Sequence, residues 1–571
     1  MIRTKLIIGL ALCGLTVAYF MHRYPVTLPY SADPELPAEF ILRNNNASAV
    51  MIVDTAIIRS AWKKQKFSEA DFSYAWLSIL EKQIGYFDIL NIDQVTEKRF
   101  QSVSLIVSAE SVLRSPRWQQ YLEILHKLPA TVIMIFDTNV VSASRYDLDA
   151  VNWFVTETLA KTITEIRQGS PAENFSVVNR YAEQGSSQNL ESNDLVSLLG
   201  NIDSSVPQAD SLALSLFNTI AGRLPFPRWH TAPDTFSGIF LMTHDDEGIG
   251  DAGVWMNEYE SAHDYTSTTF LMPSHSLSAS GIENISKLGG EAALHWNRFE
   301  RSDKGTYDTL SFLLDRWRPF KRKQNLKMQL DWLKSRGVKT TYNRNHYFLW
   351  DNSYARTFRI LKAHGITMDF SYGPDLHQKG FLFGSAFPFH PLDENGASFM
   401  LYETPVTWVE NFAGADSAWI TQILTDNARQ FHGVIAPLYH NNTYQWGPDY
   451  EAYNSWRRNY EIAQTTGHTF MRVSELERFL QNRRESALTW TLNAGQLIIH
   501  CKSQSRDLAL LVPAANLGRP QLFSDAGNAL PVEQYRIDQI QLITASYWRI
   551  VTSAPSMQII CNRLESNIEQ R

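Results

Sequence analysis

The 571-residue chain has few cysteines and no excess of basic charge, and each shortage removes a class of protein. Three cysteines are too few for a small secreted scaffold framed by disulfides. A net charge of −7 gives no reason to expect a nucleic-acid partner. What remains is the composition of a folded globular protein, 44% hydrophobic and 19% charged, long enough for about three or four domains.

An uncharged run near the N-terminus predicts a membrane anchor. Arg3 and Lys5 precede LIIGLALCGLTVAYFM, which is slightly shorter than the ~20 residues of a full bilayer span. No A-x-A cleavage site follows at the usual distance. We therefore expect residues 1–23 to be an uncleaved anchor, residues 24–46 a tether, and the rest to lie in the periplasm or at the cell surface. A cleaved signal peptide stays the alternative.

Residues 47–220 alternate strand-like and helix-like segments. ASAVMIVDT, VSLIVSAES and ATVIMIFDT have the apolar character of buried strands, and amphipathic segments separate them. This alternation predicts a parallel sheet flanked by helices, a Rossmann- or flavodoxin-like α/β domain. Asp54 and Asp137 end two strands, where such sheets bind ligands. With no glycine-rich phosphate loop and no cysteine nucleophile nearby, we interpret the domain as structural or as a docking domain.

A second alternating region and a β-rich region follow. After the proline-rich LPFPRWHTAPDT, residues 225–485 alternate again, with helix stop signals at Gly337 and Gly365. Several strands there end in ionisable residues, as in a (β/α) barrel, so we expect a distorted barrel. Residues 486–571 predict a small β-sandwich. Its Cys501 and Cys561 form either one disulfide or two buried free thiols.

Paired carboxylates follow the first strand of the barrel region, in FSGIFLMTHDDEGIG. Asp245 and Asp246 repel at close range, but they coexist when a metal binds one and the other acts as a base. Later strand-like segments of the same region contribute His295, Arg344, His346, Asp369 and His440. Arg344 and His346 are two residues apart and therefore share one face of a strand. Together these residues favour one active site at the strand ends.

This ordered set resembles the polysaccharide deacetylases of the NodB-homology type, carbohydrate esterase family four. The family's motifs are matched in order by THDDE, by GGEAALHWNRF with His295, by Arg344 in RNHY, by Asp369, and by LYH ending at His440. The resemblance covers about residues 235–445. The second histidine of the family pattern would fall on Phe299, so we expect His346 to supply the missing ligand.

The resemblance implies a metal-dependent deacetylase that removes N-acetyl or O-acetyl groups from a polysaccharide. Asp246, His295 and His346 are expected to bind a divalent metal, with Zn²⁺ the expected ion. The implied base is Asp245, oriented by Arg344.

The remaining expected roles concern the leaving group and the oxyanion. The implied general acid is His440, with Asp369 as its orienting residue. A backbone N–H near Tyr347 is expected to bind the oxyanion, and His244 to pack or hydrogen-bond locally.

Two other functions stay open at this stage. The incomplete ligand set is also compatible with a catalytically degenerate domain that binds glycan. A scaffolding role in an envelope polysaccharide export system, with residues 47–220 as the docking face, is the other. A glycosidase is disfavoured, because its carboxylate pair gains nothing from metal ligands.

Overall fold

The computed structural model describes residues 42–564 except for these gaps: 63–70, 129–131, 138–151, 157–158, 169–204, 224, 249, 274–276, 298–318, 349–353, 374–379, 394, 411–416, 443–450 and 494. The described residues from Asn44 onward form one compact unit. The predicted anchor lies outside the described residues, and so does Phe299. None of the described helices has both the length and the apolar character needed to cross a bilayer.

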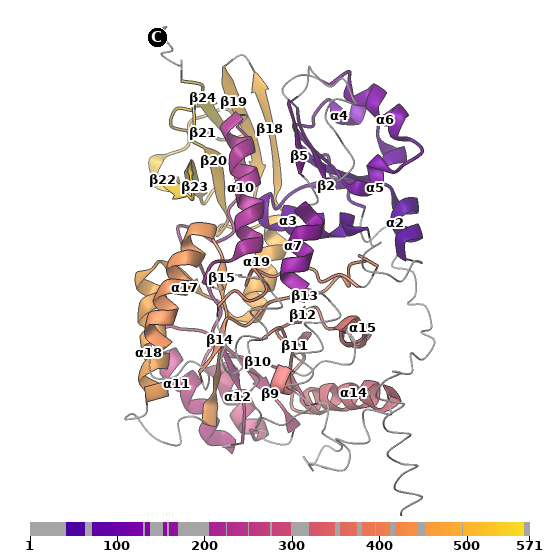
Figure 1. The fold of residues 1–571 in the computed structure, drawn as a ribbon. Coiled ribbons are helices and arrows are strands. Elements are labelled where there is room, and N and C mark those ends of the chain that lie inside the picture. Colours follow the sequence, from indigo (N-terminus) through magenta and orange to yellow (C-terminus); the bar gives the residue numbers. More distant parts are fainter. Residues whose placement is uncertain are drawn as a thin grey trace, which may run out of the picture. The chain divides into compact units, whose positions relative to one another are not determined.

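The early strands form one parallel sheet, as the alternating pattern predicted (Figure 1). Its strand order is β2-β1-β3-β4-β5, and all neighbours are parallel. The strands are β1 (Ala49–Val53), β2 (Asp88–Asn91), β3 (Leu105–Ser108), β4 (Ile133–Asp137) and β5 (Asn152–Thr156). The helices of this region are α2 (Thr55–Trp62), α3 (Ala75–Gln83), α4 (Glu97–Phe100), α5 (Glu110–Leu113), α6 (Trp118–Leu125), α7 (Leu159–Gln168) and α10 (Gln208–Arg223). The Rossmann- or flavodoxin-like name stays a prediction.

The predicted barrel region is built on an eight-stranded parallel sheet of order β13-β12-β11-β10-β9-β8-β16-β14. Its strands are β8 (Thr243–Asp245), β9 (Thr268–Leu271), β10 (Glu291–Trp296), β11 (Tyr342–Asn345), β12 (Met368–Asp369), β13 (Tyr402–Glu403), β14 (Trp408–Val409) and β16 (Pro437–His440). The helices are α11 (Trp255–Ala262), α12 (Ala279–Lys287), α14 (Pro319–Ser335), α15 (Tyr354–Ala363), α17 (Ser417–Phe431), α18 (Glu451–Thr465) and α19 (Val473–Glu485). Among the described residues the end strands β13 and β14 do not pair with each other, so the sheet is open.

Two stretches of chain pass from a smaller sheet into the eight-stranded one. In the smaller sheet β7 (Gly238–Phe240) lies between β15 (Val434–Ile435) and β17 (His468–Phe470). After the buried Leu241 and Met242 the first stretch continues as β8, and β15 continues in the same way as β16. The apolar run before THDDE is therefore buried, and it delivers the acids to the end of β8.

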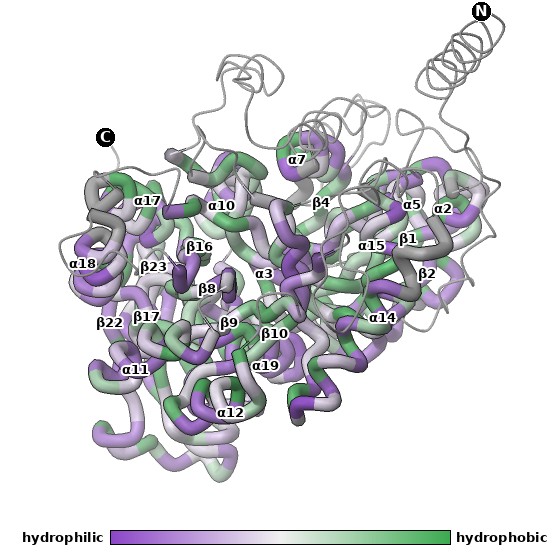
Figure 2. The backbone as a smooth tube through the Cα atoms, turned by 90° about the horizontal axis from the view of Figure 1, so that it is seen from below, coloured by the Kyte–Doolittle hydropathy of each residue, from purple (hydrophilic) through white to green (hydrophobic). Residues whose placement is uncertain are grey.

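A hydrophobic core lies between the eight-stranded sheet and the helices α12, α14 and α15. Leu271 of β9 and Leu294 of β10 belong to the same buried cluster as Leu333 of α14 and Phe358 of α15. Burying side chains of this size stabilises the fold by roughly 1.5–3 kcal/mol each. Figure 2 shows both purple and green stretches in α12, whose buried residues Gly281, Ile282 and Ile285 lie on one face of the helix.

The predicted helix stops are confirmed. α14 ends two residues before Gly337 and α15 ends two residues before Gly365. The two glycines have φ angles of 82° and 80°, a left-handed conformation that costs glycine least.

The C-terminal segment folds mostly into strands, as predicted. One antiparallel sheet has the order β18-β19-β24-β21 and the other β22-β23-β20-β6. The strands are β6 (Arg228–Trp229), β18 (Ala487–Asn493), β19 (Gln496–Lys502), β20 (Ala509–Pro513), β21 (Gln521–Phe523), β22 (Tyr535–Leu542), β23 (Ala545–Thr552) and β24 (Ser556–Asn562). β6 comes from the proline-rich junction, and the β-sandwich name stays a prediction.

The two C-terminal cysteines are buried and free. They lie on the neighbouring strands β19 and β24, where Cys501 is opposite Met557 and Cys561 is opposite Leu497. This register separates them by four positions, ~13 Å along the strand, whereas a disulfide needs Cα atoms within about 7 Å. The disulfide alternative is therefore wrong, and the alternative of two buried thiols is confirmed.

Candidate metal centre

The predicted site residues come from parallel strands that end at the same edge of the eight-stranded sheet. Asp245, the last residue of β8, is opposite His440, the last residue of β16. On the neighbouring pair of strands, His295 of β10 is opposite Arg344 of β11. Parallel strands present their carboxyl ends at the same edge of a sheet. These four side chains therefore lie at one edge although they are far apart in the sequence.

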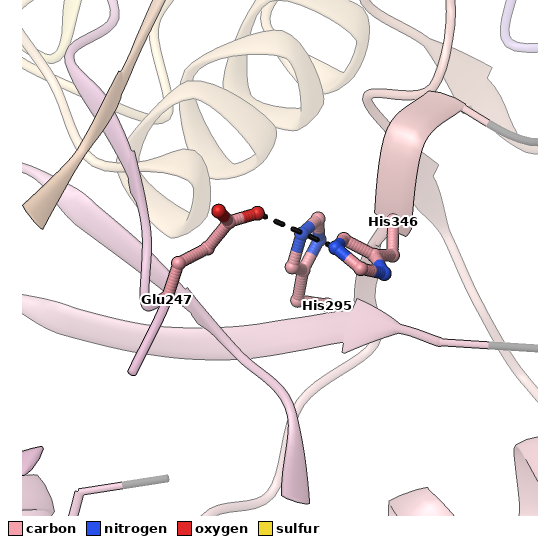
Figure 3. A group of neighbouring side chains, drawn as sticks. All are labelled: Glu247, His295 and His346. Atoms are coloured by element: carbon pink, nitrogen blue, oxygen red, sulfur yellow. Dashed lines mark ion pairs between the residues drawn. The ribbon is translucent and has the colours of Figure 1, made fainter. Parts of the chain in front are cut away.

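Three potential metal ligands meet at this edge. Glu247, His295 and His346 each offer one donor atom, and these atoms all lie within 4.8 Å of one another. His346 Nε2 is 3.4 Å from Glu247 Oε1, and the two imidazole rings are 5.1 Å apart between centroids. Figure 3 shows the carboxylate and both rings turned toward one another. One oxygen and two imidazole nitrogens form a donor set suited to a divalent ion such as zinc.

The environment of His295 prepares its ring to bind a metal. Its Nδ1 is 3.2 Å from the backbone oxygen of Arg344. A carbonyl oxygen can only accept, so Nδ1 carries the hydrogen and Nε2 keeps a lone pair. Nε2 is buried and has no hydrogen-bond partner. Burial also lowers the pKa of His295 to about 4, so the ring is neutral at pH 7, as a metal ligand must be.

The structure places Glu247, and not the predicted Asp246, in the donor group. Along an extended chain alternate residues point to the same side, so Glu247 shares the side of Asp245 and Asp246 faces away. The two oxygens of Asp246 accept hydrogen bonds from Asn441 Nδ2 at 2.8 Å and from the backbone N–H of Leu277 at 3.2 Å. Burial raises the pKa of Asp246 to about 7.

Glu247 also has an unusual electrostatic environment. Burial alone would raise its pKa, but His440, His346 and His295 hold that pKa well below its usual range. The carboxylate is therefore negative at neutral pH, which is the form that binds a cation. The sequence did contain this signal, since the period-two rule singles out the acid two positions after Asp245.

Arg344 hydrogen-bonds to Asp245, the residue that it was predicted to orient. Its Nη1 donates to Asp245 Oδ1 at 2.7 Å, and its Nη2 donates to Thr243 Oγ1 at 2.7 Å. The guanidinium is fully buried and lies 4.2 Å from the centroid of the Phe270 ring. The other oxygen of Asp245 is 3.5 Å from His295 Nε2. Asp245 is thus fixed at one oxygen and turned toward the donor group with the other.

The residue that orients His440 is Glu410, which the sequence analysis missed. Glu410 Oε1 accepts from His440 Nδ1 at 2.6 Å and from the backbone N–H of His440 at 2.9 Å. His440 Nε2 then lies 3.5 Å from Glu247 Oε1. Burial would lower the pKa of His440, but Glu410 and Glu247 raise it to about 10. A signal existed in VTWVE, an apolar run that ends in an acid.

Asp369, the predicted orienting residue, makes other contacts. Its Oδ1 accepts from Asn343 Nδ2 at 2.7 Å and from Ser371 Oγ at 2.9 Å. Burial raises its pKa to about 6. The position beside His440 that was predicted for Asp369 is occupied by Glu410. The local role predicted for His244 agrees with its contact to Glu260, at 2.6 Å from Nε2 to Oε1.

A strained turn presents His346. The next two residues, Tyr347 and Phe348, have φ angles of 55° and 51°, a conformation that costs a non-glycine residue about 1–3 kcal/mol. The Phe348 ring packs so closely over Gly373 that a Cβ there would lie 2.3 Å from it. Tyr347 is 66% exposed, and its ring lies 3.9 Å from that of His346. Such strain persists where packing enforces it, often at functional sites.

Comparisons with known proteins give a match only among solved structures. No family model and no curated protein matches the sequence. A family 4 carbohydrate esterase from Streptomyces lividans is 12% identical, with a TM-score of 0.25 over 41% of this chain and 93% of its own. A peptidoglycan deacetylase from Bacillus subtilis is 14% identical, with a TM-score of 0.23 over 43% and 93%. A polysaccharide deacetylase from Bacillus cereus is 12% identical, with a TM-score of 0.25 over 41% and 91%.

The chain is similar to polysaccharide deacetylases. Because identities and TM-scores are this low, the likeness carries no argument about function, and the proposal below rests on the site residues.

Proposed function

We propose that the protein is an exported, membrane-anchored, metal-dependent deacetylase of an acetylated polysaccharide. The observation that carries the proposal is the meeting of Glu247, His295 and His346 beside Asp245. Three protein ligands leave a coordination position open, as in catalytic zinc sites. A divalent cation bound there would lower the pKa of water and polarise an acetyl carbonyl.

The carboxylate of Asp245 accepts the proton of the attacking water. Arg344 fixes Oδ1, so Oδ2 is the oxygen available to act as the base. The backbone N–H of Tyr347 is the proposed donor to the oxyanion. Because the strained turn fixes this peptide group, little reorganisation is needed during the reaction.

The proton for the leaving group comes from His440. Its raised pKa, about 10, keeps the imidazolium protonated at neutral pH, the state required of a general acid. Glu410 binds Nδ1, so Nε2 is the atom that donates. Water and the acetyl group give acetate, and the proton from His440 completes the free amine or hydroxyl of the sugar.

The proposed location rests on the apolar N-terminal segment. We propose that the run LIIGLALCGLTVAYFM stays in the membrane and that the catalytic region lies outside the cytoplasm, where envelope export or assembly partners are available to it. A reporter fused to the C-terminus should be active only if it works in an exported environment, and activity confined to cytoplasmic reporters would refute this topology.

Metal content and acetate release, measured on the same full-length preparation, test the proposed chemistry. We expect about one divalent ion per chain and acetate release from at least one glycan in a panel carrying N-acetyl or O-acetyl groups. Chelation should abolish the release and added Zn²⁺ should restore it. Glycan binding without any metal would instead favour the catalytically degenerate binding protein.

A further inference from the structure

A second polar site lies away from the eight-stranded sheet edge, where α3, β6, the end of α17 and the C-terminal strands meet. A small cavity there has room for about one water-sized occupant. Lys82, Arg228 and His432 line it together with the apolar Trp229, Leu511 and Leu542. The proposed deacetylase chemistry uses none of these residues.

Among the residues that the structure describes, no carboxylate pairs with the buried cation of Arg228. Its side chain is 3% exposed. Nη1 donates to Gln83 Oε1 at 2.6 Å, and the guanidinium lies 4.9 Å from the ring centroid of Tyr547. Nε has no hydrogen-bond partner. Neither partner is negatively charged, and a buried charge that lacks a counter-ion costs several kcal/mol.

The charged groups near Arg228 do not supply the missing negative charge. Lys82 Nζ is 2.7 Å from Asp210 Oδ2, but Arg167 Nη2 lies 3.6 Å from the other oxygen of the same carboxylate. One acid therefore serves two buried cations. Arg483 adds a further buried guanidinium, and it donates to three backbone oxygens, among them that of Lys82. With Glu81, whose charge acts on Arg483, two buried carboxylates accompany the four buried cations Lys82, Arg167, Arg228 and Arg483, so positive charge is in excess around the cavity.

His432 adds a neutral group with an unused ring nitrogen. Burial and the surrounding cations hold its pKa well below the usual range, so the ring carries no charge. Nδ1 is buried and has no hydrogen-bond partner. The residue also has a φ of 47° at the end of α17, where glycine or asparagine is normally preferred. Packing therefore holds this ring beside the cavity despite the backbone strain.

We propose that this cavity binds one small inorganic anion of the chloride class. The sign follows from Arg228, which pairs with no carboxylate among the described residues, and the small space limits the occupant to a monatomic ion. The apolar walls disfavour a larger hydrated anion. Because the lining comes from segments far apart in the sequence, the anion binds only the folded chain and stabilises it as its concentration rises.

Thermal unfolding of the full-length protein tests the proposal. At constant ionic strength, gluconate, which is too large for the cavity, is replaced stepwise by chloride. We expect a saturable rise in Tm of about 2–4 °C. Arg228→Gln should lose this rise. The matched control is Arg536→Gln, because Arg536 pairs with Asp234 at the surface and is 57% exposed, and it should keep the rise.

A second measurement does not depend on whether Arg228→Gln folds. Crystals of the wild-type protein soaked in bromide should show an anomalous peak within hydrogen-bonding distance of Arg228. A Tm that does not change with chloride at constant ionic strength, or a cavity without a bromide peak, would overturn the proposal and indicate that the space holds water.

Discussion

The two parallel sheets both end strands in acids, but they use those acids differently. In the five-stranded sheet Asp54 accepts from two backbone N–H groups at the start of α2. Asp137 accepts from two N–H groups at the start of α7 and from Trp76 Nε1 at 2.8 Å. In the eight-stranded sheet, by contrast, Glu247 and His295 direct their donor atoms at one another.

The comparison teaches that a carboxylate at a strand end does not by itself make a site. Helix starts satisfy the acids of the first sheet, which supports the interpretation of Asp54 and Asp137 as structural residues. The second sheet leaves a buried imidazole nitrogen of His295 without a partner. Convergent potential ligand atoms, one of them without a hydrogen-bond partner, distinguish the candidate site from the acids of the first sheet.

The largest expected effect compares a residue at the edge of the eight-stranded sheet with one at the edge of the five-stranded sheet. His295→Ala should reduce metal content to background and acetate release by more than about 10³-fold, because the ion loses one of three protein ligands. The matched control is Asp54→Ala, which should lower the free energy of unfolding by ~1 kcal/mol through the lost helix cap and leave metal content unchanged. Elemental analysis and denaturant unfolding measure the two outcomes. Full metal occupancy in His295→Ala would contradict the assignment.

The next effect concerns the base. Asp245→Asn should keep the metal, since Asp245 is not in the donor group, and it should lower kcat by about 10²- to 10⁴-fold. Added metal should not restore the rate. Steady-state acetate release together with elemental analysis checks both points, and an unchanged kcat would remove Asp245 from the mechanism.

A smaller effect distinguishes the two adjacent acids. Glu247→Gln should weaken metal affinity by roughly 10- to 100-fold or more, with activity partly rescued by excess metal, because an amide is a poorer ligand for the cation. Asp246→Asn should keep its metal, because the oxygens of Asp246 bind Asn441 and Leu277 instead. Competition with a chelator measures both affinities. The reverse ranking would restore Asp246 as the ligand.

The smallest expected effect tests whether a buried histidine outside the candidate metal site affects only stability. His468 lies outside the donor group, with Nδ1 3.0 Å from Thr466 Oγ1, and burial lowers its pKa to about 4. A depressed histidine pKa means that the unfolded chain takes up the proton first. Its contribution is therefore complete above about pH 6.5 and is lost as the pH falls toward 4.

Between pH 7 and pH 4.5 the free energy of unfolding of His468→Asn should fall by about 1–2 kcal/mol less than that of the wild type. The metal content of this variant should be unchanged. Denaturant unfolding at pH 7 and pH 4.5 measures the difference, with the exposed His500→Asn as the control. An equal acid sensitivity in the wild type and in both variants would show that His468 does not contribute.

Much of the architecture could be predicted from the sequence, because it depends on local patterns. The strands around Asp54 and Asp137 and the helix stops at Gly337 and Gly365 follow from periodicity and glycine geometry. The closeness of Asp245 to Arg344 also follows from patterning, since parallel strands end at one edge.

The remainder depended on register and long-range pairing. Glu410 orients His440 because β14 lies beside β16, and no pattern in the sequence fixes that neighbour. The separation of Cys501 from Cys561 is a matter of strand register in the same way. The position of Glu247 beside His295 and His346 is different, because strict use of strand alternation would have predicted it.

The strained turn at Tyr347 and Phe348 has a consequence for how the candidate site meets its ligand. In the folded chain the Phe348 ring packs over Gly373, and Tyr347 and Phe348 both have left-handed backbone conformations. If the proposed metal site is correct, the entropy of ordering His346 is lost on folding and does not reduce the free energy of ion binding. Flexible metal sites lose that entropy on capture. The turn is pre-organised for the proposed ion. The rate of ion exchange should therefore depend on access past the exposed Tyr347 ring and not on rearrangement of the loop.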